Sequence, residues 1–556
     1  MLVKRSGGSS LFNDIIEYFK NIPYIVAVLV ATISSYLFFV THYSVSIDDL
    51  SRERYILDGY IAAQGRFSGS IIACVFDLFD VDTGLMEMLG IFFLLLSAMV
   101  FCVCFDKLYK TENKIPQILF SCFLITYPLH AEIFVYTGCT LSVGFGFFLV
   151  SVSLWIIENS LETAGDEKFG FKSIKKFVLP TLFLMFVTSW YESVLCVYFG
   201  AVFALIGLKM FSYNDKEKFT FRRFVLYGIH FAKPLCVAVI LEFIIQKVII
   251  GIIDLDIYNF AANKATLLVD FSWSNIVLMI RSIASYWVLP VFYYLPITVF
   301  AISVIVGVIC FLAISVWNKD FKYILVFAGL ILSTAILTVL RLGAADYRIS
   351  QPVAFFVAFM VFMVLILLYE NKKRLFIVLR KIVVAVLIIV CINQITELNY
   401  WFNLEDIKYQ NEKATVQQIA NKLDTEYDTE KPVVFVGKYY VGDYVEEKVV
   451  IQEGTFAYKL WKLFFDGNGE KMYRRIPQTI CLPYITWAVD AFGEVNTELL
   501  KLFSYLGYDY IQGTKEMYED ALIKAENKPA WPKNGSISDE DEYILVNFGI
   551  EPAKAE

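Results

Sequence analysis

The sequence predicts a polytopic α-helical membrane protein that ends in a soluble α/β domain. Hydrophobic residues make up 58% of the 556 residues and charged residues only 19%, a balance that is too apolar for an ordinary soluble protein. Apolar runs of about the 20 residues that a membrane helix needs recur between residues 23 and 397, and the hydropathy collapses after Tyr400. We therefore predict a cytoplasmic leader over residues 1–22, a membrane domain over 23–398 and an extracytoplasmic domain over 399–556.

The apolar runs predict about eleven transmembrane helices. The first run begins too far into the chain, and is too long, for a cleaved signal peptide, so it reads as a retained helix. The boundary between the two spans stays open in each of the closely spaced pairs, 115–157 and 177–211. The predicted spans lie near residues 23–42, 84–105, 115–135, 138–157, 177–191, 193–211, 225–252, 293–317, 323–340, 351–369 and 382–397.

Lysine and arginine are distributed unevenly between alternate loops, which predicts the orientation. The loops that hold Lys4, Lys107, Lys172, Arg222 and Lys372 carry roughly three times as many of these residues as the loops between them. By the positive-inside rule the N-terminus is cytoplasmic, and an odd number of spans places the C-terminal domain outside.

Charge and composition exclude several classes of function. A net charge of −7, with no concentrated basic face, argues against nucleic acid as a partner. The ten cysteines lie mostly inside apolar runs, where a thiol behaves as a small hydrophobe, so a disulfide framework is not expected. With three scattered histidines and no C-x-x-C pair, the chain has no ligand set for zinc.

The C-terminal domain shows strand and helix patterns. PVVFVGKYY reads as a buried strand that ends at Gly437, LLKLFSYLGYDYI as a helix passing into a strand, and DEYILVNF as the strand that closes the sheet. The glycine pattern of a dinucleotide site, G-x-G-x-x-G, is absent.

The stretch SIDDLSRERY follows the first span and is unusually polar. Ser46 and Asp49 form a capping-box pattern, and apolar positions then repeat at helical spacing, which predicts an outer-face amphipathic helix over about 46–70. A second such helix is predicted over about 271–290. On this stretch alone, a purely structural role and a functional one are equally supported.

The other outer loops also place polar side chains at the ends of apolar spans. Because ionisable groups at membrane depth cost several kcal/mol unless they face a cavity or a partner, they indicate a functional site. Simple solvation of Glu192 and interfacial anchoring of Arg341 and Arg348 remain alternatives. The candidate residues are Asp48, Asp49, Arg52, Arg66, Glu132, Tyr136, Tyr191, Glu192, Arg281, Arg341 and Arg348, with His130, Asp346 and Tyr347 beside them.

With these motifs in view, the chain resembles the Gtr-type, serotype-converting glucosyltransferases, membrane enzymes of the GT-C fold. The resemblance rests on the order of SIDDLSRERY, QGRFSG, SWYES, RLGAADYRISQP, ELNYWFNLEDIKYQNE, KPVVFVGKYY and KPAWPKNGSI, which together span nearly the whole chain. It implies transfer of a hexose, by default glucose, from an undecaprenyl-phosphate-linked donor to a surface polysaccharide. The reaction would occur on the outer face of a bacterial cell membrane. Glu192 departs from the family, in which glutamine is common at this position.

The resemblance also implies that an acid in the first outer loop is the catalytic base, which matches Asp48 and Asp49. We expect Asp49 to be the base, Asp48 or Glu132 to orient the acceptor, and Arg66, Arg341 or Arg348 to hold the lipid phosphate. Arg52, Tyr136, Tyr191, Glu192 and Arg281 complete the expected binding set. Single displacement would invert the anomeric centre.

No cofactor is expected, although Asp48 and Asp49 offer the hard oxygen ligands that suit Mg²⁺ or Mn²⁺. Expected partners are the bilayer, a donor synthase and a flippase. The aromatic side chains of the C-terminal domain, Trp461, Tyr484, Trp487 and Trp531, either stack on acceptor sugars or pack in its core.

Two other functions fit parts of the pattern. A transporter or flippase of lipid-linked sugars predicts charges and broken helices near the bilayer midplane, whereas the acids here cluster at span ends. A structural or assembly protein predicts that the tail acts without the membrane domain and that Asp48 and Asp49 tolerate alanine.

Overall fold

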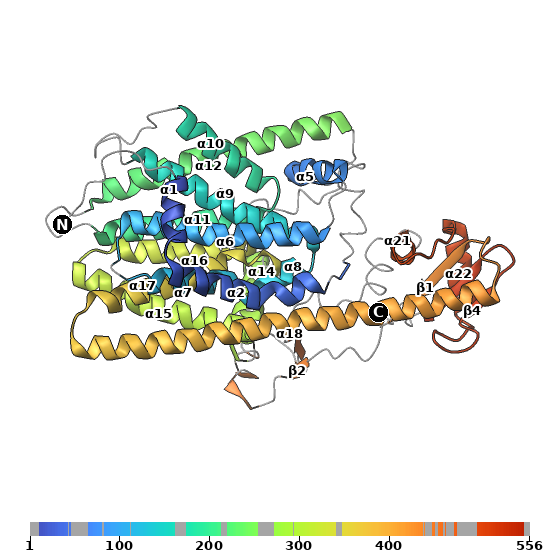
Figure 1. Cartoon of the computed structure of the whole chain (residues 1–556). Coiled ribbons are helices and arrows are strands. Elements are labelled where there is room, and N and C mark those ends of the chain that lie inside the picture. Colours follow the sequence, from blue (N-terminus) through green and yellow to red (C-terminus); the bar gives the residue numbers. More distant parts are fainter. Residues whose placement is uncertain are drawn as a thin grey trace.

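The computed structural model is a helical bundle joined by one long helix to a small C-terminal domain (Figure 1). The residues that it describes are 11–42, 44–45, 65–79, 83–111, 113–161, 174–212, 219–253, 272–292, 294–340, 347–437, 439, 448–450, 454–456, 458–459, 462, 472–474 and 497–549. The predicted amphipathic helix over 46–70 falls mostly outside these residues.

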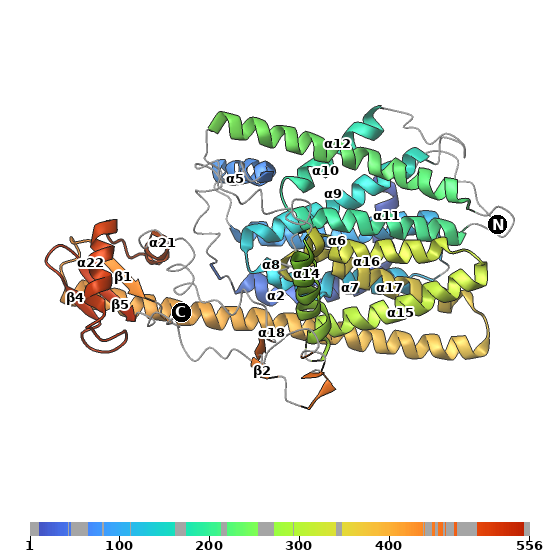
Figure 2. The same cartoon turned by 180° about the vertical axis from the view of Figure 1, so that it is seen from behind.

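The helices of the bundle run roughly alongside one another, and an amphipathic helix, α14, lies across them (Figures 1 and 2). The first half of the bundle contains α1 (Leu11–Phe19), α2 (Ile22–Thr41), α5 (Phe67–Leu78), α6 (Thr83–Leu108), α7 (Ile115–Thr126), α8 (Ala131–Phe134), α9 (Thr137–Leu161), α10 (Ile174–Thr188) and α11 (Glu192–Ser212). The second half contains α12 (Phe221–Ile253), α14 (Trp273–Ile283), α15 (Leu295–Asn318), α16 (Lys322–Leu340), α17 (Gln351–Glu370) and α18 (Arg374–Glu426). Short turns η2 (Pro128–His130), η4 (Ala284–Val288), η5 (Leu289–Phe292) and η6 (Tyr347–Ile349) connect them.

Within the described residues, ten helical segments are long and apolar enough to cross a membrane, consistent with a polytopic membrane protein. The run predicted at 177–191 corresponds to α10, which has 15 residues and is shorter than the about 20 that a full span needs. The run at 115–135 is interrupted, because α7 ends at Thr126 and is followed by η2 and α8.

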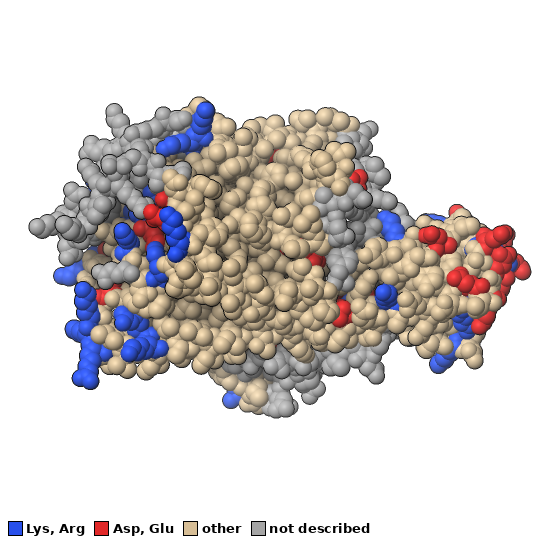
Figure 3. Space-filling view, viewed as in Figure 1, with Lys and Arg blue, Asp and Glu red and all other residues tan. Residues whose placement is uncertain are grey.

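Charge separates the two ends of the bundle. Lysine and arginine gather at one end, beyond a broad uncharged belt, whereas acidic side chains are prominent on the C-terminal domain (Figure 3). Buried or half-buried ion pairs secure this basic end, with Lys209 Nζ 2.9 Å from Glu158 Oε1 and Lys322 Nζ 2.7 Å from Asp320 Oδ2. We call the opposite end, which carries Arg66, Glu132, Tyr191 and Arg348, the distal end.

Helices α6 and α9 approach each other through glycine. A Cβ atom added to Gly144 would lie 1.9 Å from the carbonyl oxygen of Gly90, and one added to Gly90 would lie 2.4 Å from that of Thr140. Small residues allow such backbone contact between membrane helices, where packing and hydrogen bonding replace the hydrophobic effect. This contact fixes the start of α9, directly after the distal turn that contains Glu132.

Helix α18 connects the two parts of the molecule. It runs along the bundle and continues beyond it to the C-terminal domain (Figures 1 and 2). The boundary predicted at residue 399 therefore falls inside a single helix of 53 residues. Its first half is apolar, whereas its second half has charged and polar residues on the exposed side.

The C-terminal domain contains a three-stranded sheet in the order β1 (Val433–Gly437), β5 (Ile544–Gly549), β4 (Ile537–Asp539). Strand β5 is parallel to β1 and antiparallel to β4, and α21 (Thr497–Tyr505) and α22 (Lys515–Ala525) belong to the same domain. A separate hairpin pairs β2 (Lys448–Val450) with β3 (Met472–Arg474). The strand expected after α21 is reduced to one bridge between Gln512 and Val433.

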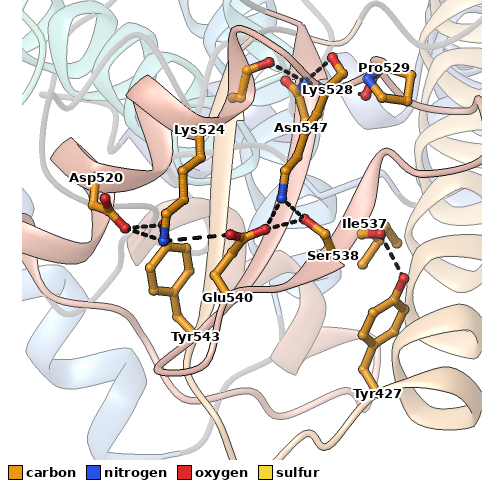
Figure 4. A network of polar contacts seen from close by, with 11 residues as sticks. Tyr427, Asp520, Lys524, Lys528, Pro529, Ile537, Ser538, Glu540, Tyr543 and Asn547 are labelled. Carbon is orange, nitrogen blue, oxygen red and sulfur yellow. Dashed lines mark hydrogen bonds and ion pairs between the residues drawn. The ribbon is translucent and has the colours of Figure 1, made fainter.

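A polar network joins α22, β4 and β5 (Figure 4). Lys524 Nζ lies 2.7 Å from Asp520 Oδ2 and 3.5 Å from Glu540 Oε2, while Lys528 donates to Ser538 and Glu540. The hydroxyl of Tyr427, just past α18, donates to the carbonyl of Ile537 at 2.7 Å and so ties the long helix to the sheet.

We predict that Gly144→Ala lowers the stability of the full-length protein in detergent by about 1–3 kcal/mol, because the added methyl group overpacks the α6–α9 contact. Gly138→Ala is the matched control, since it lies on the same helix and its added Cβ would meet no atom within 4 Å. Thermal unfolding of both variants measures the effect, and equal stabilities would contradict the packing argument.

Candidate functional site

The distal end begins with a break between α7 and α9. The residue before a proline avoids the helical conformation, and Tyr127, which precedes Pro128, is extended with φ −66° and ψ 120°. The chain then forms η2 and the short helix α8, which contacts η6 and α18. The break therefore places the short segments η2 and α8 against other elements of the distal end.

Side chains satisfy the carbonyl groups that this break leaves without helical partners. His130 Nε2 lies 2.9 Å from the carbonyl oxygen of Leu124, and the Tyr36 hydroxyl donates to the carbonyl of Ile125 at 2.7 Å. The break is also bonded to another helix, because the hydroxyl of Tyr127 donates at 2.7 Å to the carbonyl of Pro296 in the first turn of α15. His130 is 1% exposed, so its position here supports a structural role.

Glu132 lies in α8 with no exposed surface. Its carboxylate interacts electrostatically with Tyr294, the N-cap residue of α15, as does that of Glu397 on α18. Burial raises the pKa of the Tyr294 hydroxyl well above its ordinary value, and the negative charge of Glu132 raises it further. Tyr294 is therefore a protonated hydrogen-bond donor at physiological pH.

Aromatic rings from two distant segments pack against Tyr294. Its ring centroid lies 5.5 Å from that of Trp401 on α18, in a stacked arrangement, and 5.5 Å from that of Tyr347 in η6. Trp287 in η4 packs edge-on against Tyr347 at 6.0 Å. We call Trp287, Tyr294, Tyr347 and Trp401 the distal aromatic cluster.

The turn between α10 and α11 is bonded to η6. The carbonyl of Arg348 accepts a hydrogen bond from the Tyr191 hydroxyl at 3.0 Å and another from Gln351 Nε2 at 2.6 Å. Ser193 Oγ donates to Gln351 Oε1 at 2.6 Å. These bonds fix the backbone of η6 and leave the Arg348 side chain exposed.

The segment at the start of α5 docks on the same turn. Ser68 N donates to the carbonyl of Ser189 at 3.2 Å, their hydroxyls lie 2.5 Å apart, and Arg66 Cζ lies 6.0 Å from the centre of the Tyr191 ring. Gly65 has a left-handed φ of 88°, and a Cβ there would lie 2.6 Å from Glu242 Oε1 of α12. The glycine thus lets this segment approach a carboxylate on α12.

Contacts at the distal end connect four of the predicted site residues. Arg66 lies near the Tyr191 ring, and the Tyr191 hydroxyl donates to the Arg348 carbonyl. Glu132 interacts with Tyr294, whose ring packs against Tyr347, the residue next to Arg348. Tyr136 is buried near this end, one turn after Glu132. Glu192 is half-buried in the first turn of α11, where a carboxylate complements the helix dipole. Arg281 lies in the last turn of α14. Asp48, Asp49, Arg52 and Arg341 lie outside the described residues.

Sequence reasoning missed several residues of this region. Glu87 in the second turn of α6 is 2% exposed, and Glu242 and Glu397 are half-buried on α12 and α18. Their occurrence inside or beside apolar runs is the signal that could have identified them. Tyr294, Trp287 and Trp401 carried no such signal, since aromatic residues are common where membrane helices reach the interface.

The arrangement offers a buried carboxylate, hydrogen-bond donors on aromatic rings and two arginines within one end of a membrane domain. A carboxylate can accept a proton or orient a hydroxyl, and guanidinium groups bind phosphate through several N–H donors. The described residues contain no group of three or more His, Cys, Asp or Glu that could hold a metal ion.

We predict that Tyr191→Phe lowers the free energy of unfolding by about 0.5–1.5 kcal/mol, the usual net contribution of one hydrogen bond, because the Arg348 carbonyl loses a donor. Tyr369→Phe, at the basic end, is the control, since its ring keeps the contact with Arg380 Cζ at 4.2 Å. Thermal unfolding in detergent compares the two. A Tyr191→Phe protein as stable as the control would show that this bond does not hold η6.

Comparison with known proteins identifies the family. Searches of curated proteins and of solved structures found no match. A family model described as "Glucosyl transferase GtrII" matches residues 37–368, more than half of the chain and a range that includes Arg66, Glu132, Tyr191 and Arg348. The chain therefore belongs to the GtrII glucosyl transferase family.

Proposed function

We propose that this glucosyltransferase takes a hexose, most simply glucose, from an undecaprenyl-phosphate-linked donor and attaches it to a surface polysaccharide. The single observation that carries this proposal is the position of Glu132, a fully buried carboxylate at the distal end, next to segments that also bring Arg66 and Arg348. A buried acid beside cations suits a reaction that deprotonates a hydroxyl and releases an anion.

The proposed chemistry is a single displacement. The leaving group is a lipid phosphate, which departs as an anion and needs no strong general acid. The base takes the proton of the acceptor hydroxyl, the hydroxyl oxygen bonds to the anomeric carbon, and the bond to the phosphate oxygen breaks. Attack opposite the leaving group inverts the anomeric centre.

We assign the roles as follows. Asp49 is the base, and Asp48 or Glu132 orients the acceptor hydroxyl. Arg66 and Arg348, with Arg341, hold the phosphate, because a guanidinium matches its oxygens with paired donors. No metal is required in this scheme, and glycosyl transfer that stops on chelation would instead assign Mg²⁺ or Mn²⁺ to Asp48 and Asp49.

The proposed topology follows from charge. The basic end faces the cytoplasm by the positive-inside rule, which puts the distal end and the C-terminal domain on the outer face. Support comes from the gathering of lysine and arginine at one end of the bundle and the emergence of α18 from the other (Figures 1 and 3). The C-terminal domain would then lie on the side from which a surface polysaccharide approaches.

We predict that Asp49→Asn lowers hexose transfer by about 10²- to 10⁴-fold, the usual contribution of a positioned base, without changing membrane insertion. Asp77→Asn is the matched control, because Asp77 is an exposed acid on α5, beside the distal end. Transfer is measured with membranes and a radiolabelled lipid-linked donor, and near wild-type transfer by Asp49→Asn would remove this residue as the base.

We predict that Arg348→Ala lowers kcat/KM for the lipid-linked donor by about 10- to 100-fold, because hydrogen bonds to charged groups contribute about 1.5–3 kcal/mol. Arg348→Lys should recover only part of the loss, since an ammonium lacks the paired donors of a guanidinium. Lys372→Ala, an exposed cation at the basic end, is the control. Equal kcat/KM values for Arg348→Ala and the control would exclude phosphate binding by Arg348.

A further inference from the structure

Three hydrogen-bond donors in the distal aromatic cluster are buried and have no partner among the described residues. They are the Tyr294 hydroxyl and the indole N–H groups of Trp401 and Trp287. Tyr294 is 2% exposed and Trp401 is fully buried, so bulk water does not reach them in place of a partner.

Such groups are expensive to bury. Tyr and Trp that are buried usually find a partner for the polar atom, because an unsatisfied buried donor costs about 1–3 kcal/mol. Nearby side chains of the same type obey this rule, since the hydroxyls of Tyr36 and Tyr127 both donate to backbone carbonyls at 2.7 Å. The exceptions therefore call for an explanation, and a bound ligand is one that also accounts for their clustering.

The chemistry of the three groups specifies the ligand. All three are neutral donors carried by aromatic rings, and one of them, the Tyr294 hydroxyl, interacts electrostatically with the carboxylate of Glu132, which is an acceptor. A hexose presents hydroxyl oxygens that accept hydrogen bonds, hydroxyl protons that a carboxylate accepts, and C–H faces that contact aromatic rings. A phosphate needs cations, whereas the contacts that the described residues show for this cluster are aromatic rings and a carboxylate, with Arg66 beside Tyr191 and the Arg348 side chain exposed.

The depth of the cluster distinguishes the donor from the acceptor. Tyr294 and Trp401 are 0–2% exposed and Trp287 is half-buried, and this depth suits a single sugar residue, whereas a polymeric acceptor needs an open surface. Tyr294 caps the start of α15, and Trp401 follows the apolar part of α18, so both lie at the level where a lipid-linked headgroup meets water.

We propose that Tyr294, Trp401 and Trp287 form the subsite that binds the hexose of the lipid-linked donor, with their O–H and N–H groups donating to its hydroxyl oxygens. This assignment rests on the proposed function and names the residues that recognise its sugar. Glu132 accepts a hydrogen bond from the same hexose in this arrangement.

The test compares two phenylalanine variants of the full-length protein in detergent. Tyr294→Phe removes a hydroxyl that has no partner among the described residues, so the unliganded variant should be as stable as wild type or more stable. Tyr127→Phe removes a hydroxyl that donates to Pro296 and should be less stable. Trp401→Phe is a second variant that keeps an aromatic ring and removes an N–H that has no partner in the described part of the chain.

Thermal unfolding is measured first. Each protein is then titrated with undecaprenyl phosphate and with undecaprenyl phosphate-glucose, and the difference in affinity between the two lipids gives the contribution of the hexose. We expect wild type and Tyr127→Phe to prefer the glucosylated lipid to the same degree. In Tyr294→Phe and Trp401→Phe this preference should fall about 3- to 10-fold, as expected for one lost hydrogen bond. Undecaprenyl phosphate alone should bind all four proteins equally.

An unchanged preference in Tyr294→Phe and Trp401→Phe overturns the subsite assignment and leaves the proposed function intact. If wild type itself shows no preference for undecaprenyl phosphate-glucose, or for the galactose and N-acetylglucosamine forms, then the proposed donor fails and the subsite with it.

Discussion

The distal end depends on one constraint, which is that irregular backbone at the edge of a bilayer must find hydrogen-bond partners within the protein. The Arg348 carbonyl accepts hydrogen bonds from the side chains of Tyr191 and Gln351. The carbonyl groups at the end of α7 are bonded by the Tyr36 hydroxyl and the His130 ring. The bonds from Tyr191 and Tyr36 join segments far apart in the sequence, whereas those from Gln351 and His130 are local. The need to satisfy the backbone therefore also assembles the motifs of the site.

Within this framework, polar side chains divide into two groups. One group serves the fold, as the His130 ring and the Tyr36 hydroxyl do for the end of α7. The other group is buried without such a role, and the clearest members are the Tyr294 hydroxyl and the Trp401 N–H. This contrast is the physical reason for locating substrate recognition at the distal aromatic cluster.

Much of the fold could be predicted from the sequence, because long apolar runs and loop charges reflect the bilayer directly. The interruption after Thr126 and the continuity of α18 through residue 399 could not, since hydropathy reports neither a proline-induced break nor a helix that changes from lipid to water. The sequence predicted a site among polar residues at span ends, and of these Arg66 lies near the Tyr191 ring and the Arg348 carbonyl accepts from the Tyr191 hydroxyl. It missed Tyr294 and Trp401, because their significance lies in the lack of hydrogen-bond partners among the described residues, which only three-dimensional packing reveals.

The central claim is that a lipid-linked hexose is bound and transferred at the distal end, and photocrosslinking tests it most directly. A photoreactive analogue of undecaprenyl phosphate-glucose, with the reactive group on the sugar, would be activated on the full-length protein in native membranes and the labelled peptides mapped by mass spectrometry. The account predicts labelling of peptides that contain η4, η6 and the Trp401 region of α18, with competition by unlabelled donor. Labelling confined to the basic end, around Glu158, Lys209 and Lys322, would contradict it.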